Sequence, residues 1–263
     1  MTTPGTPSFP LSELPAGTLI GPAGRPLMWV GDAPAGPGDW ARYGEPARSA
    51  GLLPVLLADD GPWGPGWWTH EESFRPGRMS APDDHHAEVV LRENWARVVP
   101  DEEEGDGEDG AGLIAPFGRS WAGLAEPGPA GGDPARAAAG AADELIAEGG
   151  PKPPRLALVP AGRSADIPTA AGWTGPTNYE NDTALLSAVL RSWEDRYGAR
   201  VVAMGFDYLV LSVAAPPRTS AGALALAAEH FAFCPDNIWQ GAGSIRDYAP
   251  ELRGADGWTF WWD

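Results

Sequence analysis

The densest group of chemically versatile side chains in this sequence lies in the segment of residues 228–241. The segment offers carboxylates, an imidazole, a thiol, an amide and an indole, carried by Glu229, His230, Cys234, Asp236, Asn237 and Trp239. His230 and Cys234 are four residues apart, so they project from the same side if the segment is helical. These residues are therefore the candidates for contacting a ligand or a partner.

Three kinds of chemistry suit this group. The Cys234 thiolate could be a nucleophile with His230 as its base and Asp236 or Asn237 as a polar partner. His230 and Cys234 could also supply half of a zinc site. In the third interpretation, His230 and Asp236 exchange protons with a ligand while Cys234 only packs.

Each of these chemical interpretations meets an obstacle in the sequence. Cys234 would lie at a helix C-terminus, where the helix dipole disfavours a thiolate. The remaining metal ligands would have to be the distant His85 and His86, so we predict no metal and no cofactor. Phosphate-binding glycine loops and the Gly-x-Ser-x-Gly elbow are also missing from the sequence.

A structural interpretation of the same segment needs no chemistry. His230 would extend the apolar face of a helix, and Cys234 would fill a small gap in the core. Pro235 would end the helix, and Asp236 and Asn237 would cap the next turn. We favour this interpretation over ligand binding and catalysis, so no catalytic residue is assigned.

The elements that must position this segment are best defined from residue 155 onward. Apolar and alternating runs predict strands at 156–159, 200–204, 208–213 and 258–263. One amphipathic helix begins after the cap pair Asn181-Asp182 and ends before Gly198. A second helix begins after Thr219 or Ser220 and leads into the candidate segment.

The order of these elements predicts a fold. It runs strand, helix, strand, strand, helix, strand, and residues 205–207 join the middle strands as a hairpin. This order is typical of the ferredoxin-like domain, in which two helices cover one face of an antiparallel sheet. We therefore predict an α+β fold with a ferredoxin-like βαββαβ C-terminal domain at residues 155–263.

The N-terminal half is less regular. Residues 1–26, rich in Pro, Gly and Thr, predict an irregular lead-in. Residues 27–150 predict a looser α/β region packed against the C-terminal domain. Within it, Pro54 favours an edge or bulged position for a strand at 52–57. The acidic stretch 101–112 predicts a disordered loop, and a Pro/Gly/Ala-rich stretch before residue 155 marks the domain boundary.

Composition limits the function further. The 263 residues carry a formal net charge of −18, which repels phosphate backbones and argues against nucleic-acid binding. No apolar run reaches the roughly 18 residues of a membrane span, and the N-terminus lacks the features of a secretory signal. A single cysteine excludes an internal disulfide framework. We therefore expect a cytoplasmic protein that does not bind membranes.

Four stretches of the C-terminal half resemble a known bacterial family. They are Trp173-Thr174-Gly175-Pro176-Thr177-Asn178-Tyr179, Arg191-Ser192-Trp193-Glu194-Asp195-Arg196-Tyr197-Gly198-Ala199, Ala228-Glu229-His230-Phe231-Ala232-Phe233-Cys234-Pro235-Asp236-Asn237 and Trp261-Trp262-Asp263. The family is the bacterial domain of unknown function numbered 4253, and the resemblance covers residues 155–263. It implies a bacterial cytosolic protein without an established activity, so it supplies no catalytic residues.

Two functions stay open at this point. The first is a non-catalytic protein-binding module, for example an immunity-type protein that neutralises a basic partner, because the net charge is −18 and no catalytic motif is complete. The alternative is an enzyme or small-ligand sensor that uses His230, Asp236 and Asn237, which requires a cavity at those side chains. The sequence leaves the oligomeric state open.

Overall fold

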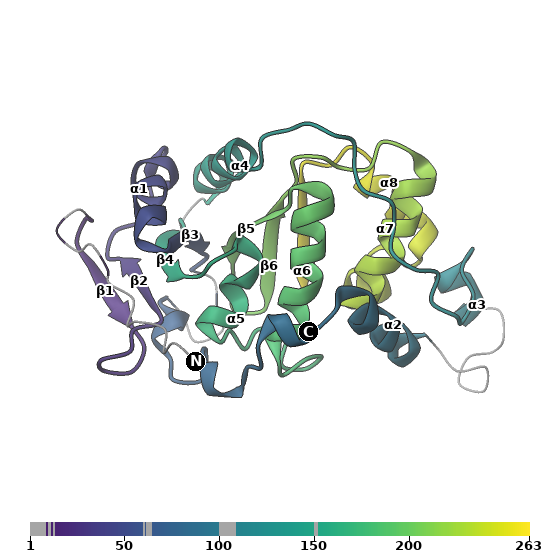
Figure 1. The fold of residues 1–263 in the computed structure, drawn as a ribbon, viewed down its shortest axis with the longest axis horizontal. Helices are drawn as coiled ribbons and strands as arrows, with labels where there is room; N and C mark the ends of the chain where they lie inside the picture. Colours follow the sequence, from purple (N-terminus) through teal and green to yellow (C-terminus); the bar gives the residue numbers. More distant parts are fainter. Residues whose placement is uncertain are drawn as a thin grey trace.

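One mixed sheet runs through both halves of the sequence (Figure 1). The computed structural model describes residues 9, 12, 14–59, 61, 65–99, 109–149 and 152–263, and within them seven strands pair in the order β1-β2-β4-β3-β5-β6-β7. Neighbouring strands are antiparallel except β3 and β5, which are parallel. The strands are β1 Gly17–Ile20, β2 Met28–Gly31, β3 Leu52–Leu57, β4 Arg155–Pro160, β5 Arg200–Met204, β6 Tyr208–Ser212 and β7 Gly257–Trp261.

Helices surround this sheet, which confirms the predicted α+β class. The α-helices are α1 Glu45–Ala47, α2 Ala87–Val98, α3 Asp109–Ile114, α4 Pro134–Glu148, α5 Ile167–Ala171, α6 Thr183–Tyr197, α7 Ser220–Phe233 and α8 Ile245–Leu252. Shorter helical turns lie at Trp40–Gly44, Arg48–Ala50, Trp67–Thr69, Pro76–Arg78, Pro82–Asp84, Ser164–Asp166 and Asn237–Ala242. In the described part of the chain, no helix combines the length and the apolar character that a membrane crossing requires.

The strand order differs from the ferredoxin-like order that we expected. In that topology a single helix joins two strands, which then run parallel to each other. Here two helices, α7 and α8, join β6 to β7, and two more, α5 and α6, join β4 to β5. The extra helix reverses the chain once more, so β7 returns antiparallel to β6 and directly beside it. Since β3 also lies between β4 and β5, the ferredoxin-like βαββαβ domain is not found.

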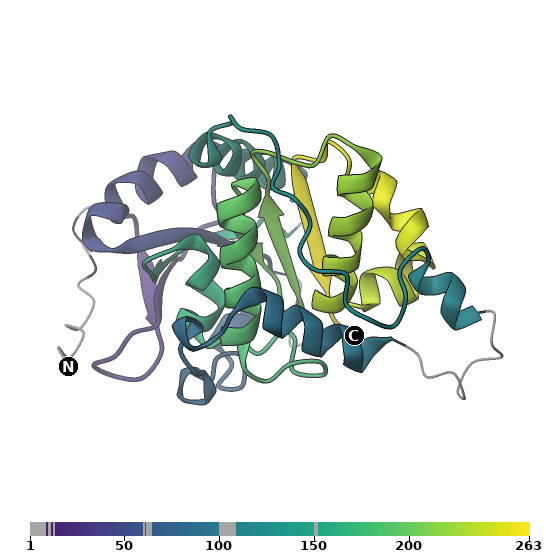
Figure 2. The same ribbon diagram turned by 45° about the vertical axis from the view of Figure 1, so that its right-hand side comes forward.

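The helices pack on both faces of the sheet (Figures 1 and 2). On one face α2, α6 and α7 contact one another and bury the larger part of the core. On the other face α4 lies against β5 and β6 and packs Ala138, Ala142 and Ile146 beside Val202. The sheet is therefore an internal layer over most of its width.

Local sequence signals set the ends of the helices as predicted. The Asp182 carboxylate accepts a hydrogen bond from Ala184 N at 3.0 Å, and α6 ends at Gly198 with φ of 62°. Thr219 Oγ1 accepts a hydrogen bond from Gly222 N at 3.0 Å and so begins α7. The hairpin of β5 and β6 is present as well, so the second half of the chain follows its local patterns closely.

The N-terminal half corrects three expectations. The lead-in of residues 1–26 is not wholly irregular, because β1 (Gly17–Ile20) pairs along its length with β2. The acidic stretch 101–112 lies outside the described residues up to position 108, and from Asp109 the chain forms α3 instead of a loop. The expected boundary before residue 155 lies between strands that belong to one sheet.

A fourth difference concerns Pro54. Its strand, β3, is neither at the edge nor bulged, because β4 pairs with it over the whole range Leu52–Leu57. On the other side, however, β5 pairs only with Leu56 and Leu57. Pro54 therefore stands beyond the end of the β3–β5 pairing, where the missing N–H of proline interrupts no ladder on that side.

Candidate functional site

The structure brings the six sequence-predicted residues together at the end of α7 and in the turn that follows it. Glu229 and His230 lie on the last turns of α7, Cys234 caps its end, and Asn237 opens the helical turn Asn237–Ala242. Glu229, His230 and Cys234 are fully buried, and Asn237 is buried as well. The group therefore faces the protein interior and the neighbouring strand β7.

Glu229 forms a buried ion pair with Arg196 on α6. The two guanidinium nitrogens of Arg196 donate to the Glu229 carboxylate at 2.8 and 2.5 Å. Ala125 N and Trp193 Nε1 also donate to this carboxylate, at 2.7 and 2.8 Å. Burial acts to lower the pKa of Arg196, but the hydrogen bonds and charge of Glu229 outweigh it and hold that pKa above its ordinary value. Glu229 thus joins α7, α6 and the loop at Ala125.

His230 lies inside a cluster of aromatic rings. Its ring centroid is 4.8 Å from those of Trp193, Trp258 and Phe260, and Nδ1 is hydrogen-bonded to the Tyr248 hydroxyl at 3.1 Å. The second ring nitrogen, Nε2, has no hydrogen-bond partner among the described residues. Burial, and to a lesser extent the charge of Arg196, lower the pKa of His230 well below its ordinary value. The imidazole is therefore neutral and closed off from ligands.

This burial makes folding stability depend on pH in a predictable direction. Unfolding exposes an imidazole with a pKa of about 6.5, so below that pH only the unfolded chain takes up the proton. We expect the wild-type chain to lose about 2 kcal/mol more unfolding free energy between pH 7 and pH 5 than His230→Gln does. Urea denaturation at both pH values measures this difference.

The matched control is His85→Gln, which changes a half-buried histidine outside this cluster. It also removes one imidazole from the chain, but it leaves the rings around His230 in place. Equal slopes for wild type and His230→Gln would contradict the account of a neutral, buried imidazole.

Cys234 and Asn237 close the free edge of the sheet. Strand β7 is an edge strand, and Trp262 N donates to Asp207 O while Val213 N donates to Asp256 O. The peptide groups of residues 257, 259 and 261 therefore point away from β6, toward the open side.

The segment after α7 binds three of these outward peptide groups. Asn237 Nδ2 donates to Thr259 O at 2.7 Å, and Trp261 N donates to Asn237 Oδ1 at 3.4 Å. The Cys234 thiol donates to Trp261 O at 2.9 Å, and burial raises the pKa of that thiol far above its ordinary value. We call Cys234 and Asn237 the edge cap; a buried, protonated thiol of this kind is no nucleophile.

Removing the edge cap should destabilise the protein and open the edge of the sheet. We expect Asn237→Ala to cost about 2 kcal/mol, because Thr259 O and Trp261 N lose their partner in a part-buried setting. The exposed edge should also raise the tendency to aggregate. Chemical denaturation and light scattering on heating measure the two effects.

Gln240→Ala serves as the control for this change. Gln240 lies on the same helical turn, is exposed, and contacts only Asp236 at 3.2 Å among the bonds described for it. It should change stability by less than about 0.5 kcal/mol. If both variants behave alike, the edge cap is not what stabilises β7.

Asp236 and Trp239 differ from the other four residues because they reach the surface. Asp236 Oδ2 accepts a hydrogen bond from Asp263 N at 3.2 Å, which continues the line of contacts along the chain after β7. Trp239 is 48% exposed, with its ring edge-to-face against Phe231 at 5.8 Å. Of the six predicted residues, only these two are accessible to a partner without rearrangement.

Metal binding finds no support in the described part of the chain. Within it, no three side chains of His, Cys, Asp or Glu are grouped so that they could hold a metal ion. His85 is hydrogen-bonded to Ser80 Oγ at 2.6 Å, and neighbouring Asp83 is ion-paired with Arg191. These residues therefore have structural contacts near the start of α2.

The edge cap and strands β4 to β7 lie in a segment that matches a known family model. Residues 155–263 match the family model described as Domain of unknown function (DUF4253). This match confirms the resemblance seen in the sequence. Comparison with curated proteins and with solved structures gave no match. The matched model describes a domain of unknown function, so it assigns no activity to these residues.

A groove that the sequence analysis missed lies between α4 and strands β6 and β7. It has a volume of about 460 Å³, and apolar side chains of both elements line it, among them Leu145 on α4 and Val210 on β6. The DUF4253 segment supplies the sheet side, and α4, outside that segment, supplies the other. We call it the α4 groove.

Carboxylates dominate the α4 groove. Its charged residues are Asp133, Glu144, Glu148 and Asp256 against a single guanidinium, that of Arg136. On α4 the lining positions 137, 141, 144 and 148 recur every three or four residues, so they form one helix face. The spacing of these residues in the sequence predicts that they share one face of α4. Which strands lie against that face depends on the order of the strands in the sheet.

Proposed function

We propose that this protein is a non-catalytic, cytosolic bacterial binding module that docks a basic segment of a partner protein in the α4 groove. The observation that carries the proposal is an apolar floor bordered by four carboxylates and one guanidinium. The predicted immunity-type role, in which the partner is a basic toxin, is one concrete form of this function.

Charge complementarity selects the occupant. The α4 groove has an excess of three negative charges, and the whole chain has a formal net charge of −18, so basic partners are attracted from a distance and held locally. The apolar floor favours a segment that also carries apolar side chains. A stretch that combines Leu or Ile with Lys or Arg fits both properties.

The alternative function, an enzyme or sensor built on His230, Asp236 and Asn237, receives no comparable support. His230 is surrounded by aromatic rings, and Asn237 is occupied by the peptide groups of β7. Neither residue lines the four cavities described for this chain. A reaction at these atoms would require α7 and β7 to separate.

The direct test uses a peptide of alternating Lys and Leu, labelled with a fluorophore and titrated with the full chain. We expect the double variant Glu144→Lys/Glu148→Lys to bind about tenfold more weakly than wild type, because it reverses two charges at the α4 groove. The matched control is Glu88→Lys/Glu93→Lys, which makes the same charge change on the exposed side of α2. It should bind within about twofold of wild type.

Two outcomes would overturn the proposal. One is an equal loss of affinity in both double variants, which would show general attraction to an acidic surface rather than docking. The other is no measurable binding of the peptide by wild type at low salt. A native partner isolated with the wild-type chain should be lost from the Glu144→Lys/Glu148→Lys variant and retained by the α2 variant.

A further inference from the structure

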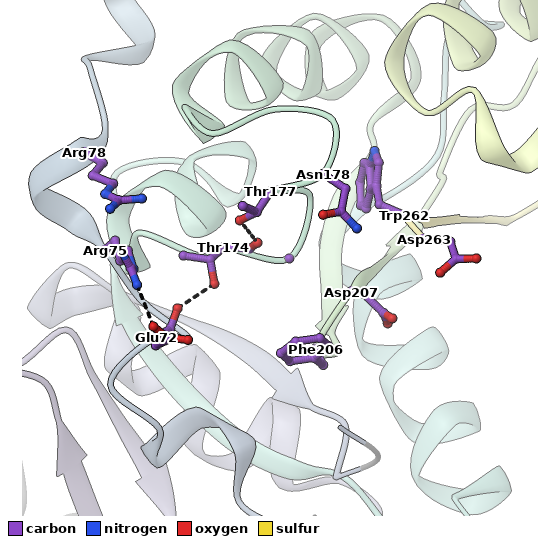
Figure 3. A pocket seen from close by; sticks show the side chains of 11 residues that line it. Glu72, Arg75, Arg78, Thr174, Thr177, Asn178, Phe206, Asp207, Trp262 and Asp263 are labelled. Atoms are coloured by element: carbon purple, nitrogen blue, oxygen red, sulfur yellow. Dashed lines mark hydrogen bonds and ion pairs between the residues drawn. The ribbon is translucent and has the colours of Figure 1, made fainter. Parts of the chain in front are cut away.

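A second hollow, unrelated to the α4 groove, lies where the N-terminal half meets the DUF4253 segment (Figure 3). It has a volume of about 380 Å³, which lies in the range of small-molecule sites. We call it the dipolar cleft, because both of its guanidinium groups lie on one side, with Glu72 paired to Arg75 there, and its other two carboxylates lie on the opposite side. Arg75 and Arg78 stand on one side, and Asp207 and Asp263 stand on the other (Figure 3).

The floor of the dipolar cleft is held by backbone contacts between the two halves of the chain. Arg75 N donates to Gly172 O at 2.6 Å, and Thr174 N donates to Ser73 O at 3.2 Å. At Gly175 an added Cβ would lie 2.0 Å from the Trp173 ring and 2.8 Å from Phe206 O, so only glycine permits this packing. The arginine side is thus tied firmly to the aspartate side.

The arginine side is suited to a carboxylate. Arg75 shares its guanidinium with Glu72 at 3.1 Å, and both side chains stay partly exposed. Arg78 is exposed, and no hydrogen bond or ion pair of its side chain is described. Two guanidinium groups against one carboxylate leave a net positive side that can pair with an anionic group.

The opposite side is suited to an ammonium group. Asp207 and Asp263 supply carboxylates, and Phe206 supplies the ring that a small cation favours. Asn178 lies beside Trp262 (Figure 3). Its side-chain amide can both donate and accept hydrogen bonds with a ligand between the two sides. The ring of Trp262 is almost fully buried, packed edge-to-face on Trp173 at 5.7 Å, so this wall is rigid.

From this separation of charge we infer that the dipolar cleft binds a small zwitterion of the amino acid or dipeptide class. Its carboxylate pairs with Arg78 and Arg75, and its ammonium group lies between Asp207 and Asp263. Since Arg75 and Arg78 lie outside residues 155–263, the carboxylate half of this site is not part of the DUF4253 segment. The inference is independent of docking in the α4 groove.

Calorimetric titration of the full chain with the free L-amino acids and a set of dipeptides is the first measurement. We expect at least one zwitterion to bind, and to bind at least about tenfold more tightly than its methyl ester or its deaminated acid. Those two analogues remove one charge each and leave the rest of the molecule in place. Absence of binding for every member of the panel at about 10 mM would overturn the inference.

Variants then assign each charge to its side of the dipolar cleft. Arg78→Gln should abolish the preference for the zwitterion over its methyl ester and keep the preference over the deaminated acid. Asp263→Asn should abolish the preference for the zwitterion over its deaminated acid and keep the preference over its methyl ester. Arg92→Gln and Asp84→Asn, both exposed on or near α2, are the matched controls and should leave both preferences intact.

The pattern across variants decides the inference. If Arg78→Gln and Asp263→Asn both keep the two preferences, the ligand binds elsewhere and the inference is wrong. Glu144→Lys/Glu148→Lys should leave zwitterion affinity unchanged, so failure at the dipolar cleft and failure at the α4 groove can be told apart.

Discussion

Replacing Glu229 with alanine is expected to lower the free energy of unfolding by about 3–5 kcal/mol, because it leaves a buried guanidinium without its counter-ion. The Arg196 side chain is only 12% exposed and that of Glu229 is not exposed at all. The change also removes the acceptor of Trp193 Nε1 and of Ala125 N. Chemical denaturation at pH 7 measures the loss.

Two further variants sharpen this prediction. Asp195→Ala breaks the surface pair with Arg163, in which the aspartate side chain is 67% exposed, and should cost at most about 1 kcal/mol. The double change Glu229→Met/Arg196→Met removes both buried charges and should recover part of the loss seen in Glu229→Ala. If Glu229→Ala lowers the free energy of unfolding by less than about 1 kcal/mol, the Arg196 guanidinium must become solvated when its partner is removed, and the prediction is wrong.

Replacing Trp193 with alanine should have an effect of similar size, about 3–5 kcal/mol, through the cavity that it leaves. Trp193 is fully buried, stacks on Phe260 at 5.3 Å and contacts the rings of His230 and Phe233 at 4.8 Å. Its indole therefore joins α6, α7 and β7 at one point, and alanine fills little of that space.

Trp239→Ala is the control for this second prediction. It removes the same side chain from a position that is 48% exposed, so the loss should stay below about 1 kcal/mol. Urea denaturation of both variants gives the comparison, and equal losses would contradict the central place of Trp193. Because Trp193 donates to Glu229, the effects of Trp193→Ala and Glu229→Ala should not add in the double variant.

The sequence predicts those features that depend on neighbours along the chain. The caps of α6 and α7, the β5–β6 hairpin and the aromatic strand β7 follow from side chains within a few residues of each element. The strand order could not be predicted in the same way. It depends on whether a crossover holds one helix or two, and α5, with Ile167-Pro168 at its start, looks like part of a loop.

The candidate site shows the same division. Helical spacing places His230 and Cys234 together, and the structural interpretation of Pro235 as a helix stop agrees with the end of α7 at Phe233. Asn237 binds the edge of β7 rather than its own turn. This contact spans 22 residues of the sequence, so local patterns do not predict it. The dipolar cleft could not be predicted either, because its two sides are separated by more than a hundred residues in the sequence.

The position of β3 has a consequence for how the protein is made. Leu57 at the end of β3 pairs with Met204 on β5, so the partner strand leaves the ribosome about 150 residues later. At typical synthesis rates that delay is roughly 7 to 30 seconds. Its other neighbour, β4, follows about 100 residues after β3, so this wholly apolar strand first has no neighbour on either side and then has only one. The newly made N-terminal half therefore depends on being shielded, and chaperones that hold nascent chains should associate with it until β5 has emerged.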